Sequence, residues 1–259
     1  MQDSSWYTYS LTNGKEYRLT TPTTFAAWDE DNDVPDYPSP HGLAGWTADD
    51  RNLLIYDRYD IWKFDPTAEV APVNLTVNGR KEQLSYRLIR LDKEEKFIDI
   101  TKSQLLQVFN EKTKGSGYYS AHLSAPKAPK ALLTGNFMLK TPVKAKYSDA
   151  VIYTSETFEQ YPNIRLSEKK KKKSIQLTHG EEQQANLNWG TAELVSWISL
   201  DGTPLEGVVY KPENFDPNKK YPVIVNFYER NSETLYAYHM PEPHRSTIDY
   251  HFYTSNGYI

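Results

Sequence analysis

Residues 194–228 decide the fold, and they read LVSWISLDGTPLEGVVYKPENFDPNKKYPVIVNFY. Three strand-like segments follow one another there, at 194–200, 205–210 and 223–228. The turn pair Asp201-Gly202 joins the first two, and a dense run of turn formers separates the second from the third. The third segment is almost continuously apolar. This pattern is typical of a strand that is buried on both faces of a sheet covered by helices.

Three motifs in this stretch carry a family resemblance. They are the Asp-Gly turn at 201–202, KPENFD at 211–216, and KKYPVIV at 219–225, whose strand ends at Tyr228. Together they resemble the start of the catalytic domain in the prolyl oligopeptidase family of serine peptidases, including its dipeptidyl peptidase IV branch. Members of that family usually follow the tyrosine with Gly-Gly or Ala-Gly, whereas this chain has Glu229-Arg230.

The composition bounds the class of protein. A length of 259 residues allows one large domain or two ordinary ones, and 20 Tyr, 9 Phe and 6 Trp favour sheet. The net charge of −4 gives no reason to expect a nucleic-acid partner. Because the chain has no cysteine, disulfides, thiolate metal sites and cysteine nucleophiles are excluded. No apolar run approaches the ~20 residues that span a bilayer.

A repeat runs through the first 178 residues. Four segments end in threonine after a short strand-like run, at Thr20, Thr76, Thr134 and Thr178, so the spacings are 56, 58 and 44 residues. A period of this length with about four strands per unit predicts the blades of a β-propeller. A single blade cannot bury its own faces, so it must stack on its neighbours.

The repeat divides this part of the chain into units. The best-formed unit spans 41–76 and contains four strand-like segments. A second unit spans 83–134, with its clearest hairpin turn at 114–117, and a third spans 137–178. Residues 1–20 read as the outer half of a blade.

Charged runs and histidines have a functional and a structural interpretation. The acidic run at 29–33 could ligate calcium, but it lacks the ordered spacing of an EF-hand, and we interpret it as a solvated inter-blade loop. The five lysines at 169–173 could contact an anionic surface, and we interpret them as a charged hairpin tip. The six histidines show no zinc-ligand spacing, and we interpret His239 and His244 as surface residues. We therefore expect no metal and no cofactor.

Nucleophilic catalysis of the α/β-hydrolase type needs G-x-S-x-G after a strand, followed by an acid and a histidine. That pattern is absent from the sequence, since the Gly-Ser-Gly at 115–117 belongs to a hairpin turn. The resembled family places its nucleophile well beyond the first hydrolase strands. The resemblance therefore implies a triad beyond residue 259.

The last residues predict a helix followed by a strand. Ser246 with Asp249 three residues later is typical of a helix start, and Asn256-Gly257 is typical of a helix end. The pair Tyr258-Ile259 would then begin the next strand.

We therefore expect a mainly β fold in two domains. Residues 1–190 are predicted to form the C-terminal blades of an incomplete β-propeller, about three and a half four-stranded blades. Residues 191–259 are predicted to form the first strands and helix of an α/β-hydrolase domain. The resemblance implies a part of a serine peptidase that cleaves peptides with a Ser-His-Asp triad, the propeller gating substrate access. It also implies one site residue, Tyr228, whose family counterpart donates its phenolic O–H into the oxyanion hole. Without the resemblance, Tyr228 is an ordinary buried tyrosine at a strand end.

Two other functions remain open. One is a β-propeller binding module without catalytic activity. The other is an esterase or acylpeptide hydrolase on the same scaffold, since fold does not fix substrate. The peptidase interpretation implies a peptide substrate as the partner, with no nucleic acid and no membrane span. It implies a periplasmic or cytoplasmic bacterial protein, the periplasm being favoured by the resemblance. It also predicts that this chain alone is inactive, because the nucleophile is missing.

Overall fold

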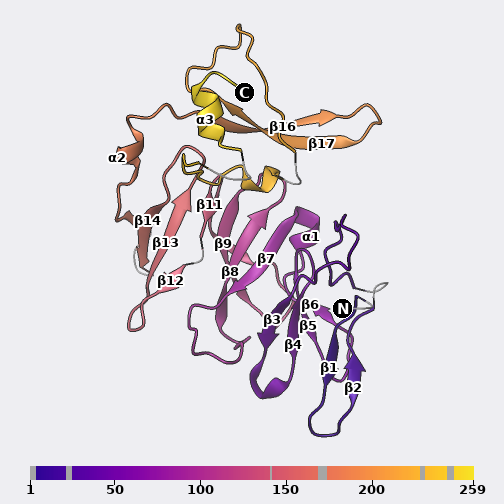
Figure 1. The fold of residues 1–259 in the computed structure, drawn as a ribbon. Coiled ribbons are helices and arrows are strands. Elements are labelled where there is room, and N and C mark those ends of the chain that lie inside the picture. The colour runs from indigo at the N-terminus through magenta and orange to yellow at the C-terminus, as the bar shows by residue number, and fades with distance from the viewer. Residues whose placement is uncertain (1–3, 22–24, 141, 169–173, 228–230, 244–247) are drawn as a thin grey trace. The chain divides into compact units, whose positions relative to one another are not determined.

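The computed structural model describes residues 4–21, 25–140, 142–168, 174–227, 231–243 and 248–259 (Figure 1). These residues are mainly β and form several antiparallel sheets, none of which is closed within the described ranges. The chain divides into two compact units, one of Met1–Lys112 and Gly117–Thr134, the other of Thr113–Ser116 and Gly135–Ile259. The mainly β class expected from the sequence is confirmed.

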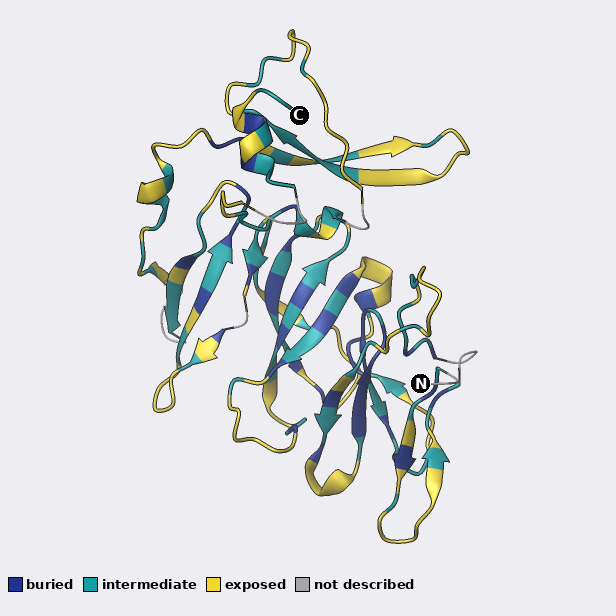
Figure 2. Cartoon of the chain, viewed as in Figure 1, coloured by how far each residue is buried: buried dark blue, intermediate teal, exposed yellow. Residues whose placement is uncertain are grey.

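The central sheet of the first unit confirms the repeat unit predicted at 41–76. Its strands lie in the order β3 (Leu43–Trp46), β4 (Leu53–Tyr56), β5 (Ile61–Phe64) and β6 (Val73–Asn74). All four residues of β4 are buried (Figure 2). Leu54 and Tyr56 pack in one apolar cluster, and Leu53 and Ile55 pack in another. Because side chains alternate along a strand, both faces of this sheet are covered, as stacked blades require.

A second sheet packs on one of these faces and confirms the unit predicted at 83–134. Its order is β10 (Lys130–Gly135), β9 (Ser116–His122), β8 (Ser103–Asn110) and β7 (Leu84–Ile89), with the short helix α1 (Gly79–Glu82) just before β7. Leu54 of the central sheet shares a cluster with Tyr86 and Leu106, all three fully buried. Burying each such side chain contributes about 1.5–3 kcal/mol. The predicted hairpin turn is displaced, because β9 already begins at Ser116 and the turn occupies 111–115.

A two-stranded hairpin, β1 (Tyr7–Tyr9) and β2 (Glu16–Arg18), precedes the central sheet and confirms the strand pair predicted in 1–20. On the other face of the central sheet, Phe25 meets Phe64 edge to face, with ring centroids 5.2 Å apart. Trp6 and Leu19, which flank the hairpin strands, pack against the same cluster.

The third sheet belongs to the second unit and agrees with the unit predicted at 137–178, with one difference. Its main strands are β13 (Ala150–Glu156), β14 (Asn163–Glu168) and β15 (Ile175–Gln176). The first strand of the unit is split into β11 (Met138–Leu139) and β12 (Val143–Lys144), and both pieces pair with β13. Pro142 lies between them, and a proline has no N–H to give to a ladder.

The repeated threonines have a structural role that the sequence spacing did not explain. The Thr76 hydroxyl accepts a hydrogen bond from the backbone N–H of Ile61 at 3.0 Å and donates to the Asp60 carboxylate at 2.6 Å. The N–H of Gly79 donates to the same Asp60 oxygen at 3.0 Å. An added Cβ on Gly79 would lie 2.7 Å from that oxygen, so the close approach needs glycine.

The same arrangement recurs in the third sheet. Thr178 accepts from the N–H of Ile164 at 2.9 Å and donates to the Asn163 side chain at 3.0 Å. The N–H of Gly180 donates to Asn163 at 2.9 Å. In the N-terminal hairpin, Thr20 accepts from the N–H of Trp6 at 2.8 Å. Each of these three threonines thus ties the start of one strand to the end of the next, whereas Thr134 lies inside β10.

The stretch that decided the fold forms two of its three predicted strands. Strands β16 (Thr191–Ile198) and β17 (Pro204–Lys211) pair antiparallel over eight residues each. The turn between them contains Gly202 at φ 88°, in the left-handed region. The third segment is not a regular strand over 222–227, and its apolar side chains are largely exposed: Val223, Val225 and Phe227 are 63%, 75% and 82% exposed. The burial on both faces that the sequence predicts for this strand is therefore not seen among the described residues.

The C-terminal helix, α3 (Tyr250–Ser255), is shorter than predicted. Its N-cap is Asp249, whose carboxylate accepts from the N–H of Phe252 at 3.0 Å, so the expected start at Ser246 is wrong. Residues 244–247 lie outside the described ranges. The predicted end is confirmed, since Gly257 has φ 79° and its N–H donates to the Thr254 carbonyl at 3.0 Å.

Aromatic rings form the interior around α3. They come from the loop after β13, from the segment before β16, from β17, from the loop after it and from α3 itself. The residues are Phe158, Trp189, Tyr210, Tyr238, His239, Tyr250 and His251. The prediction that His239 is a surface residue is therefore wrong, because its ring packs against those of Phe158 and Tyr250.

Candidate functional site

The segment that leads to Tyr228 pairs with the last residue of the chain. The N–H of Ile224 donates to the Ile259 carbonyl at 2.8 Å, and the N–H of Ile259 donates to the Pro222 carbonyl at 2.9 Å. In a parallel ladder, one residue bonds in this way to both neighbours of its partner. Ile259 therefore lies beside Val223 in parallel orientation.

This contact gives the C-terminal residues the connectivity of a strand–helix–strand unit. The chain runs through 222–227, passes α3 and returns parallel at Ile259. Tyr228 follows the carboxyl end of the first segment and itself lies outside the described residues, so its oxyanion role stays a prediction. Carboxyl ends of parallel strands are where open α/β sheets gather their active-site groups.

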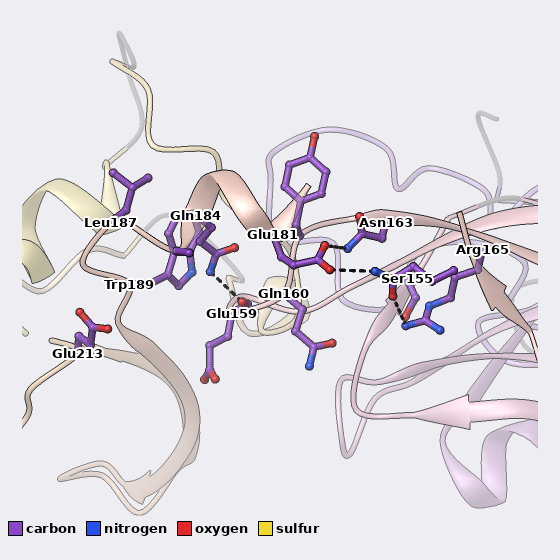
Figure 3. Close-up of a pocket in the computed structure, with 13 residues that line it drawn as sticks. Ser155, Glu159, Gln160, Asn163, Arg165, Glu181, Gln184, Leu187, Trp189 and Glu213 are labelled. Carbon is purple, nitrogen blue, oxygen red and sulfur yellow. Dashed lines mark hydrogen bonds between the residues drawn. The ribbon is translucent and has the colours of Figure 1, made fainter. Parts of the chain in front are cut away.

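A polar hollow of about 480 Å³ lies elsewhere in the second unit, beside the third sheet (Figure 3). Its walls come from β13, β14 and β15 and the loop between the first two, from α2 (Glu181–Gln184), from the segment up to Trp189, and from Glu213 after β17. Figure 3 shows Glu159 and Gln160 projecting to the same side of their loop. None of these residues is a site residue predicted from the sequence, although Glu213 belongs to the KPENFD motif at 211–216.

Glu181 is the best-held carboxylate of this hollow. It accepts hydrogen bonds from the Asn163 amide and from the Gln176 amide at 3.1 Å (Figure 3). It also accepts one from His179 at 3.1 Å. Its own backbone N–H, Asn163 and His179 hold the pKa of Glu181 below its usual value. Asn163 stands in the repeat position that Asp60 occupies in the central sheet. This correspondence between the two repeat units is the sequence signal from which Asn163 could have been predicted as a functional residue.

The lining of the hollow suits binding better than covalent chemistry. Glu159, Glu181 and Glu213 give it three carboxylates against one guanidinium, that of Arg165, so it favours cations. Ser155 also lines it, and the described lining residues include no histidine that could act as its base. A nucleophile and base pair is therefore not found in the described lining.

The acidic run at 29–33 is held by arginines. Asp31 forms an ion pair with Arg58, which also pairs with Glu111 at 2.9 Å. Glu30 pairs with Arg80 at 3.1 Å. Asp31 and Glu30 therefore have arginine partners, and the interpretation of the run as a solvated inter-blade loop stays a prediction.

The remaining features singled out in the sequence do not add a candidate site. The lysine run at 169–173 and His244 lie outside the described residues. Within the part of the chain that is described, no group of three or more potential metal-ligating side chains is found. In the same ranges, no helix is long and apolar enough to cross a membrane.

Solved structures share this fold. A putative dipeptidyl aminopeptidase IV from Bacteroides ovatus matches 98% of this chain with a TM-score of 0.59 at 16% identity. The dipeptidyl peptidase 4 of Porphyromonas gingivalis matches 98% with a TM-score of 0.55 at 15% identity. The resemblance to the prolyl oligopeptidase family and its dipeptidyl peptidase IV branch is therefore confirmed at the level of fold.

The match covers part of those proteins. This chain spans 36% of the length of the first structure and 40% of the second. No family model and no curated protein matches the sequence.

Proposed function

We propose that this chain is the part of a prolyl-oligopeptidase-type serine peptidase in which a β-propeller passes into an α/β-hydrolase domain. Residues 1–190 are the C-terminal blades, and residues 191–259 are the start of the hydrolase domain. The complete protein cleaves peptides with a Ser-His-Asp triad that lies beyond Ile259, and the propeller restricts access to it.

The observation that carries the proposal is the parallel contact between Val223 and Ile259. It follows an antiparallel hairpin, β16–β17, and it encloses α3. An antiparallel start followed by a strand–helix–strand crossover is what the resembled catalytic domain requires. The recurring threonine bonds at Thr20, Thr76 and Thr178 support the propeller interpretation of the preceding sheets.

The proposed role of this chain in the reaction is limited to one group. Tyr228 supplies a neutral phenolic O–H at the carboxyl end of its segment, aimed at the oxyanion that forms when the peptide carbonyl is attacked. The nucleophile, its base and the orienting acid come from the rest of the protein. Without those groups no tetrahedral intermediate forms, so Tyr228 has no oxyanion to stabilise.

The complete gene product tests the proposal. We expect a G-x-S-x-G sequence and later Asp and His residues downstream of Ile259, labelling of that serine by a fluorophosphonate, and hydrolysis of chromogenic dipeptide substrates. A complete product that contains no such serine, or that contains it without being labelled, would contradict the proposal and favour the binding module. Hydrolysis of simple esters or acylpeptides without cleavage of dipeptide substrates would favour the esterase or acylpeptide hydrolase.

A further inference from the structure

His251 is a buried histidine in the aromatic interior around α3. It is 5% exposed, its ring stacks on Phe158 at 4.9 Å and 17°, and its centroid lies 3.9 Å from that of Trp189. Phe158 and Trp189 are themselves joined, because the Trp189 indole N–H donates to the Phe158 carbonyl at 2.7 Å. The side chain of His251 thus joins α3 to the loop of the third sheet.

The hydrogen bonding of His251 fixes its neutral form. Its Nε2 lies 2.8 Å from the backbone carbonyl oxygen of His239, and since a carbonyl can only accept, Nε2 carries the proton. Its Nδ1 is buried and has no hydrogen-bond partner among the described residues. A second proton on Nδ1 would place a charged N–H among aromatic rings with no acceptor, which is costly.

The surroundings offer little to stabilise a charged imidazole. The titratable side chains on the elements packed around it include Glu156, Tyr210, Tyr238, His239, Asp249 and Tyr250, and the same elements also carry Tyr161, Lys211 and Tyr253. Burial raises the pKa of Tyr210, Tyr238 and Tyr250, so they stay neutral. Glu156 already accepts from the N–H of Tyr238 at 3.3 Å and from Lys140 at 3.2 Å. Glu159, next to Phe158, lines the hollow in Figure 3.

Two groups favour the charged form of His251. They are the His239 carbonyl, which already receives Nε2–H, and the Asp249 carboxylate, which caps α3 and attracts an imidazolium two residues away. Burial is the larger effect and lowers the pKa of His251 from its ordinary value of 6.5.

We propose that His251 is a pH-sensitive pin, which in its neutral form holds α3 against Phe158 and Trp189 and on protonation releases the helix from the loop of the third sheet. The released state exposes the imidazole to water, where it takes up the proton without the burial penalty. Acidification therefore loosens α3 while sheets that contain no buried histidine keep their packing.

Linkage sets the size of the effect. The released state binds more protons than the pinned state below pH 6.5, so pinning weakens as pH falls and is complete above that value. If the pinned state took up no proton, lowering the pH from 7.5 to 5.0 would favour release by about thirtyfold, which is the upper limit.

Hydrogen–deuterium exchange of the complete protein at pH 7.5 and 5.0, corrected for intrinsic rates, tests the pin. The probes are the amides of Gly257 and Tyr258, which donate to Thr254 and Tyr253 at the end of α3. We expect their protection to fall by roughly three- to thirtyfold at pH 5.0, with no comparable change in β4. Equal protection at the two pH values overturns the proposal, and this wild-type comparison needs no variant.

Two variants isolate the histidine. His251→Gln keeps an amide donor for the His239 carbonyl, and His251→Phe keeps a ring against Phe158 and Trp189. We expect whichever of them folds to lose the pH dependence of α3 protection. The matched control is His122→Gln, at an exposed histidine of β9, which should retain the wild-type dependence. A folded His251 variant with an unchanged pH dependence overturns the proposal.

Discussion

At the scale of single residues, the repeated threonines connect the sequence spacing to the fold. The side chain of Thr76 is fully buried and is at once the acceptor for the Ile61 amide and a donor to Asp60, which is 2% exposed. A buried carboxylate is tolerated only when hydrogen bonds satisfy it. Asp60 obtains them from Thr76 and from the backbone amides of Gly79 and Arg80.

Thr76→Val should therefore destabilise the first unit. The change keeps the volume but removes one donor from Asp60 and the acceptor of the Ile61 amide, so we expect a loss of about 1–3 kcal/mol in the free energy of unfolding. Thr178→Val should cost less, because Thr178 is only partly buried. Denaturant titration measures both, with Thr191→Val on exposed strand surface as the control. A Thr76→Val variant as stable as the control would show that the hydroxyl is dispensable.

The sequence predicted where these threonines lie, and it could not predict what they bond. Their partners, Asp60 and Asn163, precede them by about one strand pair, and the partner differs in type between the two sheets. A spacing shows that a unit recurs; the hydrogen bonds follow only from the register of the strands.

Tyr228→Phe tests the proposed oxyanion donor in the complete enzyme. Losing one such donor typically lowers kcat by ~10²–10³, while the ring and its packing remain. The melting transition should therefore stay close to that of the wild type. An unchanged kcat would make Tyr228 a packing residue, and a collapse of stability together with activity would make its hydroxyl structural.

At the scale of elements, the apolar pattern predicted where the strands lie along the chain better than it predicted how far their side chains are buried. The hairpin β16–β17 and the sheets up to β15 were predicted from alternation and turn residues, which are local signals. The segment at 222–227 has the apolar pattern of a buried strand and is exposed among the described residues, because burial depends on neighbours in space. The start of α3 was misplaced because Asp249, a second capping residue, lies three positions after Ser246 and caps the helix instead. The aromatic interior around His251 could not be predicted, since its rings come from residues 158 to 251.

The exposed segment at 222–227 should make this chain self-associate. Val223, Val225 and Phe227 expose large apolar side chains, and such patches drive association. Val225→Lys/Phe227→Lys should shift the chain toward monomer in size-exclusion chromatography with light scattering. The control is Tyr9→Lys/Leu11→Lys, which adds the same charge at exposed apolar residues of the N-terminal hairpin. A wild-type monomer, or an equal shift in the control, would refute this role of the segment.

At the scale of the whole molecule, the units defined by packing differ from the domains predicted from the sequence. The third sheet groups with the C-terminal residues, because Phe158 from its loop lies among rings from β17 and α3. A domain boundary near residue 190 follows from the repeat and the motifs, and these signals carry no information on which surfaces pack together. The boundary therefore stays part of the proposed function.

Because the proposed triad lies outside this chain, we expect the 259-residue chain to have no peptidase activity and the complete product to be active. The chain contains Tyr228 but no G-x-S-x-G, so an oxyanion donor is present without a nucleophile or base. We expect no turnover of chromogenic Pro and Ala dipeptides and no specific fluorophosphonate labelling of the purified chain, under conditions in which the complete product is labelled. Heat-denatured chain measures non-specific labelling, and repurification removes contaminating peptidase. Labelling of the native chain above that background, at a serine that mass spectrometry assigns, would place a nucleophile within these residues and would contradict the proposal that the triad lies beyond Ile259.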